Sequence, residues 1–112
     1  MKIDTTAGKP IDSKLLENYF TSLVNHFFKI LPIREQNEES LNTYLESLQA
    51  EMLGCKGLIT VIQEDASYLT LLSILQYLID NPDCSQKVVR REVFRAISIC
   101  NKLKFVYVDK EC

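Results

Sequence analysis

The stretch LNTYLESLQAEMLGCKGLITVIQEDASYL, residues 41–69, decides the fold of this chain. Its apolar side chains follow one another at alternating steps of four and three residues; they are Leu41, Leu45, Leu48, Met52, Cys55, Ile59, Ile62, Ala66 and Leu69. Residues three and four apart lie on one face of an α-helix, whereas a half-buried strand alternates at every second residue. The stretch therefore predicts helix with one continuous apolar stripe that faces other helices.

Length and composition place this stripe in a small globular domain. The chain has 112 residues, of which 46% are hydrophobic and 25% charged, which is ordinary for one folded domain. It has only three Gly and three Pro, too few for the turns of a many-stranded fold. We therefore predict an all-α fold, a compact bundle of about four helices whose neighbours run antiparallel.

Breaker and capping residues set the expected boundaries. Helices are predicted over residues 12–31, 37–63, 65–80 and 85–104. Pro32 ends the first, and the others begin at the N-capping residues Asn37, Asp65 and Ser85. The second helix is expected to be long or bent at Gly54 and Gly57, with a break at Gly54 as the alternative. Residues 11–104 then form a single helical domain between a flexible arm at 1–10 and a tail at 105–112.

The first predicted helix has an unusually wide apolar stripe. Its ten large apolar residues cover roughly 220° of the helix, well beyond the ~100° needed to pack on one core. We therefore expect the helix to lie centrally in the bundle, or part of the stripe to be covered by a second copy or a partner. Under the second hypothesis Phe20, Phe27 or Phe28 contributes to the covered surface.

Charge is distributed unevenly along the chain. Residues 86–104 contain six basic residues and one acid, whereas residues 34–83 contain nine acids and two basic residues, although the net charge is only -2. On the fourth predicted helix the polar side lies opposite the apolar one. We call this polar side the basic face; its candidate partner-binding residues are Lys87, Arg90, Arg91, Phe94, Arg95 and Lys102.

Three interpretations of the basic face compete. In the first it is a solvated surface whose cations partly offset the acidic second and third helices. In the second it binds an acidic protein partner, because aromatic and arginine side chains are the usual anchors of interfaces. In the third it binds nucleic acid, since a helix, a turn at 81–84 and a basic helix resemble a helix-turn-helix in outline. The acidic residues upstream count against the third.

Nothing in the sequence indicates catalysis, a cofactor or a metal. The four cysteines include no C-x-x-C pair, and there is a single histidine, His26, which is expected to be a core-boundary residue with local hydrogen-bond partners. We expect no small-molecule substrate. The most apolar run, residues 68–79, is too short to cross a membrane, and the free thiols and the polar N-terminus predict a cytoplasmic protein.

The sequence therefore predicts a non-catalytic helical protein that works through protein–protein contacts or self-association, as an accessory subunit or assembly factor. Small acidic helical proteins of this type are frequent among phage and mobile-element genes, as structural components or inhibitors of host machinery. The alternative is a nucleic-acid-binding transcriptional regulator that uses the basic fourth helix.

Overall fold

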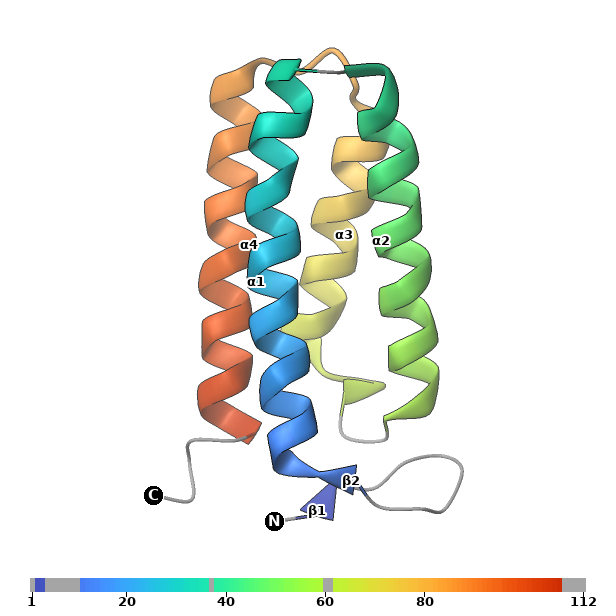
Figure 1. Cartoon of the computed structure of the whole chain (residues 1–112), viewed down its shortest axis with the longest axis vertical. Coiled ribbons are helices and arrows are strands. Elements are labelled where there is room, and N and C mark those ends of the chain that lie inside the picture. Colours follow the sequence, from blue (N-terminus) through green and yellow to red (C-terminus); the bar gives the residue numbers. More distant parts are fainter. Residues whose placement is uncertain (1, 4–10, 37, 60–61, 108–112) are drawn as a thin grey trace.

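Four helices pack side by side in the computed structural model, which describes residues 2–3, 11–36, 38–59 and 62–107 (Figure 1). They are α1 (Ser13–Gln36), α2 (Glu38–Leu58), α3 (Ala66–Asp80) and α4 (Gln86–Tyr107). A two-residue antiparallel pair, β1 (Lys2–Ile3) with β2 (Ile11–Asp12), precedes α1. The predicted all-α bundle of four helices is confirmed. Most of the predicted flexible arm, residues 4–10, and the end of the predicted tail, residues 108–112, lie outside the described residues, as does the predicted cap Asn37.

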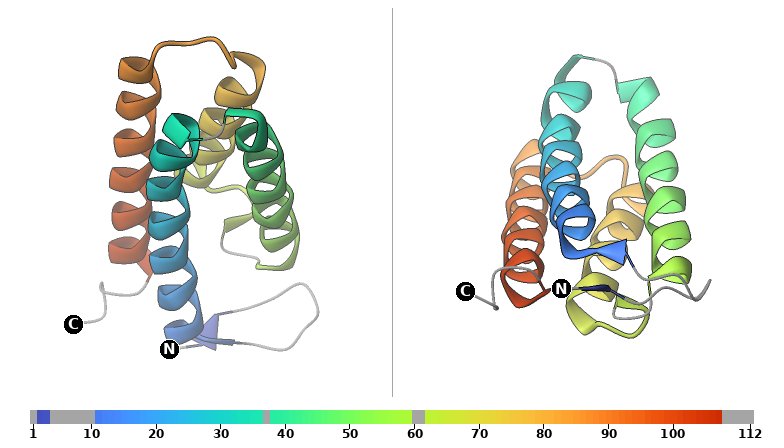
Figure 2. Two further views of the ribbon diagram at one scale, coloured as in Figure 1. Left: turned by 45° about the horizontal axis from the view of Figure 1, so that its top comes forward. Right: turned by 60° about the horizontal axis from the view of Figure 1, so that its bottom comes forward.

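Consecutive helices run antiparallel, so α1 and α3 point one way and α2 and α4 the other (Figure 1). Helices α1 and α4 pack most extensively against each other, and α3 packs against both α4 and α2. In every view α2 and α4 lie on opposite sides of the bundle (Figure 1, Figure 2). The surfaces of α2 and α4 therefore face away from each other.

The core is apolar and continuous through all four helices. The first helix contributes five side chains with no exposed surface: Leu16, Phe20, Leu23, Phe27 and Ile30. From the stripe at 41–69, five residues are buried: Leu45, Leu48, Met52, Ile59 and Ile62. Its last two members, Ala66 and Leu69, are exposed, so the prediction of one stripe reaching Leu69 is wrong. Instead α3 buries a new set: Tyr68, Leu71, Ile74, Leu75 and Leu78.

The stripe ends because the chain reverses after α2. The helix continues through Gly54 and Gly57 but stops at Leu58, not at the predicted residue 63. Gln63 turns back and donates from Nε2 to the Gly57 carbonyl oxygen at 3.2 Å, which caps the helix end. The apolar register survives into the turn, where Ile59 and Ile62 are still buried. The helical spacing of apolar residues therefore continues in the sequence beyond the last residue of the helix.

The first helix runs through Pro32 to Gln36, so the prediction that it ends at residue 31 is wrong. Contacts beyond the proline hold the extra turn in place. The Arg34 guanidinium donates to the Cys84 carbonyl oxygen in the loop before α4, and Gln86 donates to the Glu35 carboxylate at 3.3 Å. These contacts stabilise the turn although the proline lacks an N–H for the helix.

The third and fourth helices, α3 and α4, start at their predicted caps. The Asp65 carboxylate accepts from the Tyr68 N–H at 3.0 Å, and the Ser85 hydroxyl accepts from the Val88 N–H at 3.3 Å. At its far end α4 continues three residues beyond the predicted residue 104, through Tyr107. Buried Leu103 anchors this end, and neither Gly nor Pro follows to stop the helix.

Candidate interaction surface

The basic face predicted on the fourth helix exists as an exposed surface of α4. All six predicted residues are exposed: Lys87, Arg90, Arg91, Phe94, Arg95 and Lys102. The opposite side of α4 is buried against the bundle through Val89, Val93, Ala96, Ile97, Cys100 and Leu103. The amphipathic pattern of this helix therefore places its cations in solvent, with an aromatic ring among them.

Phe94 meets a second exposed ring from α1. Its ring lies edge-on to that of Phe28, with centroids 5.9 Å apart and planes at 83°. Each of the two residues is 44% exposed. An edge-to-face pair of this kind normally belongs to an apolar interior or an interface. The basic face thus has an aromatic centre built from two helices.

The wide stripe of α1 gave the only sequence signal for Phe28. Of the three phenylalanines proposed for a covered surface, Phe20 and Phe27 are wholly buried inside the chain, so that part of the hypothesis is wrong. Phe28 lies at the edge of the stripe and remains exposed. Its pairing with Phe94 could not be predicted, because it depends on which helix packs beside α1.

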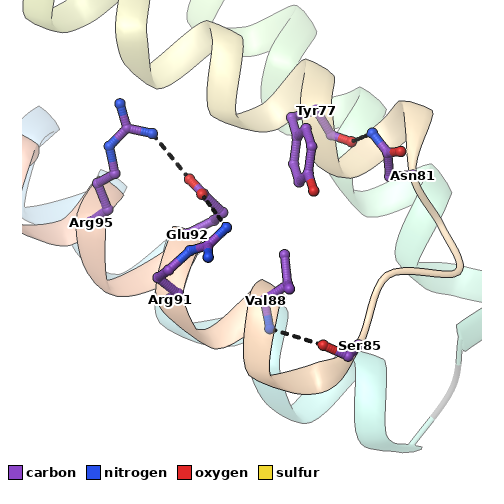
Figure 3. Close-up of polar contacts among 7 residues, drawn as sticks. All are labelled: Tyr77, Asn81, Ser85, Val88, Arg91, Glu92 and Arg95. Carbon is purple, nitrogen blue, oxygen red and sulfur yellow. Dashed lines mark hydrogen bonds and ion pairs between the residues drawn. The ribbon is translucent and has the colours of Figure 1, made fainter.

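On the side of α4 nearest α3, an acid lies between two arginines (Figure 3). Glu92 accepts from Arg91 at 3.3 Å and from Arg95 at 3.2 Å. The Glu92 side chain is 11% exposed, whereas those of Arg91 and Arg95 are 67% and 56% exposed. The two arginines therefore extend over a nearly buried carboxylate, which neutralises part of the basic face.

A shallow hollow of about 160 Å³ continues from this ion pair toward α3. Its lining residues are Thr70, Ser73, Ile74, Tyr77, Glu92 and Arg95. In Figure 3 the Tyr77 ring extends from α3 toward the surface of α4. The basic face is thus bordered by apolar or aromatic groups on both sides, Phe28 toward α1 and Tyr77 toward α3.

The remaining cations of the face have no ion pair within the described part of the chain; they are Lys87, Arg90 and Lys102. Moreover, α3 and α4 lie antiparallel along each other (Figure 1), whereas the two helices of a helix-turn-helix cross at about 90–120°. The outline resemblance noted in the sequence does not extend to the arrangement of the helices.

A polar cluster inside the bundle was not anticipated from the sequence. The Tyr68 hydroxyl donates to the Met52 carbonyl oxygen at 2.8 Å and lies 2.8 Å from the Tyr19 hydroxyl. Since Tyr68 has one proton to give, Tyr19 is the donor between the two hydroxyls. Burial, above all, holds the pKa of both tyrosines well above the usual range and raises the pKa of the adjacent Cys55 thiol. These groups stay protonated and join α1, α2 and α3.

His26 has the local partners expected of a core-boundary residue. The Tyr44 hydroxyl donates to the His26 carbonyl oxygen at 2.9 Å and lies 3.3 Å from Nδ1 of the ring. That nitrogen therefore donates to the Tyr44 oxygen. Both contacts fasten α1 to α2, which is a structural role.

A cavity of about 200 Å³ lies where the α1–α2 and α3–α4 connections meet. Its lining includes Arg34, Leu41, Leu45, Leu78 and Pro82. The guanidinium of Arg34 is already engaged by the Cys84 carbonyl. This cavity lies at one end of the bundle, and none of its lining residues belongs to the basic face.

Comparisons with models of known families, with curated proteins and with solved structures give no match to this chain. Among the described residues no helix is both long and apolar enough to cross a membrane. Within the same residues, no three His, Cys, Asp or Glu side chains gather as metal ligands would.

Proposed function

We propose that this chain is a non-catalytic, cytoplasmic interaction or assembly protein that binds an acidic protein through the basic face of α4. The observation that carries the proposal is the exposed pair of Phe28 and Phe94, with Arg90 and Arg91 four and three residues before Phe94 on the same helix. Aromatic rings surrounded by arginines are the composition typical of interface hot spots.

The two exposed rings provide apolar surface that a partner would bury. Since each of the two residues is 44% exposed, a partner that covers both removes at most roughly 180 Å² of apolar surface from water, or about 4 kcal/mol before the costs of association. The cations around the rings would steer an acidic partner toward them and repel basic ones. This combination favours a protein partner over a purely solvated surface.

The free cysteines support a reducing compartment. Cys55, Cys84 and Cys100 are unpaired thiols in the structure, and Cys100 is wholly buried. Proteins kept in oxidising compartments commonly use such residues in disulfides.

Site-specific photocrosslinking tests the proposal. A benzophenone amino acid placed at Phe94 should give a protein adduct in the cells that encode the chain, and the adduct should disappear when Arg90 and Arg91 are replaced by Ala. Leu69, an apolar residue of similar exposure on α3, is the matched control position and should give none. Equal adducts from both positions, or none from Phe94, would contradict the proposal.

The nucleic-acid alternative is tested by a separate measurement, the binding of a labelled duplex DNA. Binding that weakens steeply with salt, and weakens further in Arg91→Ala/Arg95→Ala, would show that the basic face binds the phosphate backbone of nucleic acid and not an acidic protein. No DNA binding at low salt leaves the acidic protein as the partner class.

A further inference from the structure

The two layers of the bundle carry opposite charge. Together α1 and α4 contain nine basic and three acidic residues, whereas α2 and α3 contain one basic and five acidic residues. Because α2 and α4 lie on opposite sides of the bundle (Figure 1, Figure 2), the acidic and basic surfaces face in opposite directions. The acidic surface of one copy therefore attracts the basic face of a second copy.

The outward side of α2 has the shape and composition to receive that face. Its exposed acids are Glu39, Glu46 and Glu51, and two half-exposed leucines, Leu53 and Leu58, accompany them. Between these side chains runs a line of exposed small residues at steps of four and three: Thr43, Ser47, Ala50, Gly54 and Gly57. We call these residues together the α2 acidic face.

Packing within the monomer does not require the two glycines of this line. A Cβ added at Gly54 or Gly57 would meet nothing within 4 Å. The line of small side chains leaves a low track along the helix between the flanking leucines and glutamates. Protruding rings such as Phe28 and Phe94 fit a low track better than a row of large side chains.

We propose that the acidic partner of the basic face is the α2 acidic face of a second copy of this chain. The inference rests on the function proposed above and identifies its partner. In this contact Phe28 and Phe94 of one copy pack along the small-residue track of the next, with Leu53 and Leu58 beside them. Arg90, Arg91 and Lys87 then face the glutamates of α2.

The width of α2 limits the size of this contact. The 21 residues of α2 extend about 31 Å, and a single helix with its side chains is about 10 Å wide, which gives a footprint of roughly 300 Å² before surface relief is counted. A standard interface buries about 800 Å² on each partner. The contact therefore falls in the range of a weak interface, with salt-sensitive charge pairs at its edge.

The contact is heterologous, because each copy uses a different surface. Such an interface does not close after two copies but adds further copies into a ring or an open chain. Self-association should therefore rise with concentration beyond the dimer and should weaken at high salt.

Light scattering after size exclusion tests this with two complementary variants. Arg90→Glu/Phe94→Glu removes the basic face, and Ser47→Lys/Ala50→Lys blocks the α2 acidic face; all four positions are exposed. The wild type should form species above 12.9 kDa at low salt, and each variant alone should stay at 12.9 kDa. A mixture of the two variants retains one intact contact, so it should form a species of twice that mass and grow no further.

Two controls make the outcome decisive. Leu69→Lys/Gln76→Lys adds the same charge to exposed positions of α3 outside the hollow and should assemble like the wild type, and far-UV circular dichroism checks that every variant is folded. A wild type that stays monomeric at low salt and high concentration, a variant mixture that stays monomeric, or a dimer that both variants still form would overturn the inference. A monomer that still gives the Phe94 photoadduct with another protein would leave the proposed function standing.

Discussion

Replacing Tyr68 by Phe tests the packing of the bundle most directly, because one hydroxyl joins three helices. The Tyr68 side chain, on α3, has no exposed surface. Its hydroxyl donates to the Met52 carbonyl of α2 and accepts from the Tyr19 hydroxyl of α1, each at 2.8 Å. Phenylalanine keeps the ring in the core and removes only these two hydrogen bonds.

The expected loss can be worked out from these contacts. Each hydrogen bond contributes about 0.5–1.5 kcal/mol net to the free energy of unfolding, and the half-buried Tyr19 hydroxyl would lose its acceptor at a further cost of about 1 kcal/mol. The variant should therefore lose about 2–3 kcal/mol. In a domain of this size that lowers the melting temperature by roughly 10 °C.

Urea unfolding followed by circular dichroism measures the loss. Tyr44→Phe is the matched control, because the Tyr44 hydroxyl bonds at the rim of the bundle and its removal should cost about 1 kcal/mol. In a double-mutant cycle, Tyr19→Phe and Tyr68→Phe should couple by about 1 kcal/mol. A Tyr68→Phe protein within 0.5 kcal/mol of wild type, or a cycle without coupling, would refute the reasoning.

Three further predictions concern burial, helix propensity and pH. Phe27→Asp should abolish folding, whereas Phe28→Asp should cost no more than about 1 kcal/mol in urea unfolding, and equal losses would contradict their assigned burial. Gly54→Ala should raise the free energy of unfolding by about 0.5–1 kcal/mol, since the added Cβ meets nothing within 4 Å; a loss would reveal a packing role. Burial raises the pKa of Cys100 from 9.0 to about 12, so the stability present below pH 9 should fall as the pH rises toward 12. Cys100→Ala should reduce that slope by about 1.4 kcal/mol per pH unit, and an unchanged slope would argue against this thiol.

Local signals predicted the number of helices and most of their starts. Asp65 and Ser85 cap α3 and α4 as expected, because a capping side chain acts on N–H groups two or three residues away. The helix ends were less predictable. The extra turn beyond Pro32 depends on Arg34 reaching the loop at Cys84, which is 50 residues away in sequence. A contact of that kind is set by the packed fold and not by the local sequence.

The candidate site, too, was predictable from the sequence only where one helix determines it. The periodicity of α4 alone placed the six predicted residues on one exposed side, because one helix determines which side chains share a face. The partner ring Phe28 and the pairing of Glu92 with two arginines depend on tertiary packing and rotamers. Counting charges along the chain treated Glu92 as a minor offset, whereas its burial beneath Arg91 and Arg95 makes it a fixed neighbour of both.

The position of Glu92 determines how strongly charge alone can drive binding at the basic face. A carboxylate or phosphate that approaches Arg91 or Arg95 must share guanidinium groups already paired at 3.2–3.3 Å, and taking them away would leave a nearly buried acid uncompensated. The apolar gain from Phe28 and Phe94 carries no such penalty. Affinity for a protein partner that covers both rings should therefore fall more in Phe94→Ala than in Arg91→Ala, whereas a polyanion that binds by charge alone should show the reverse order.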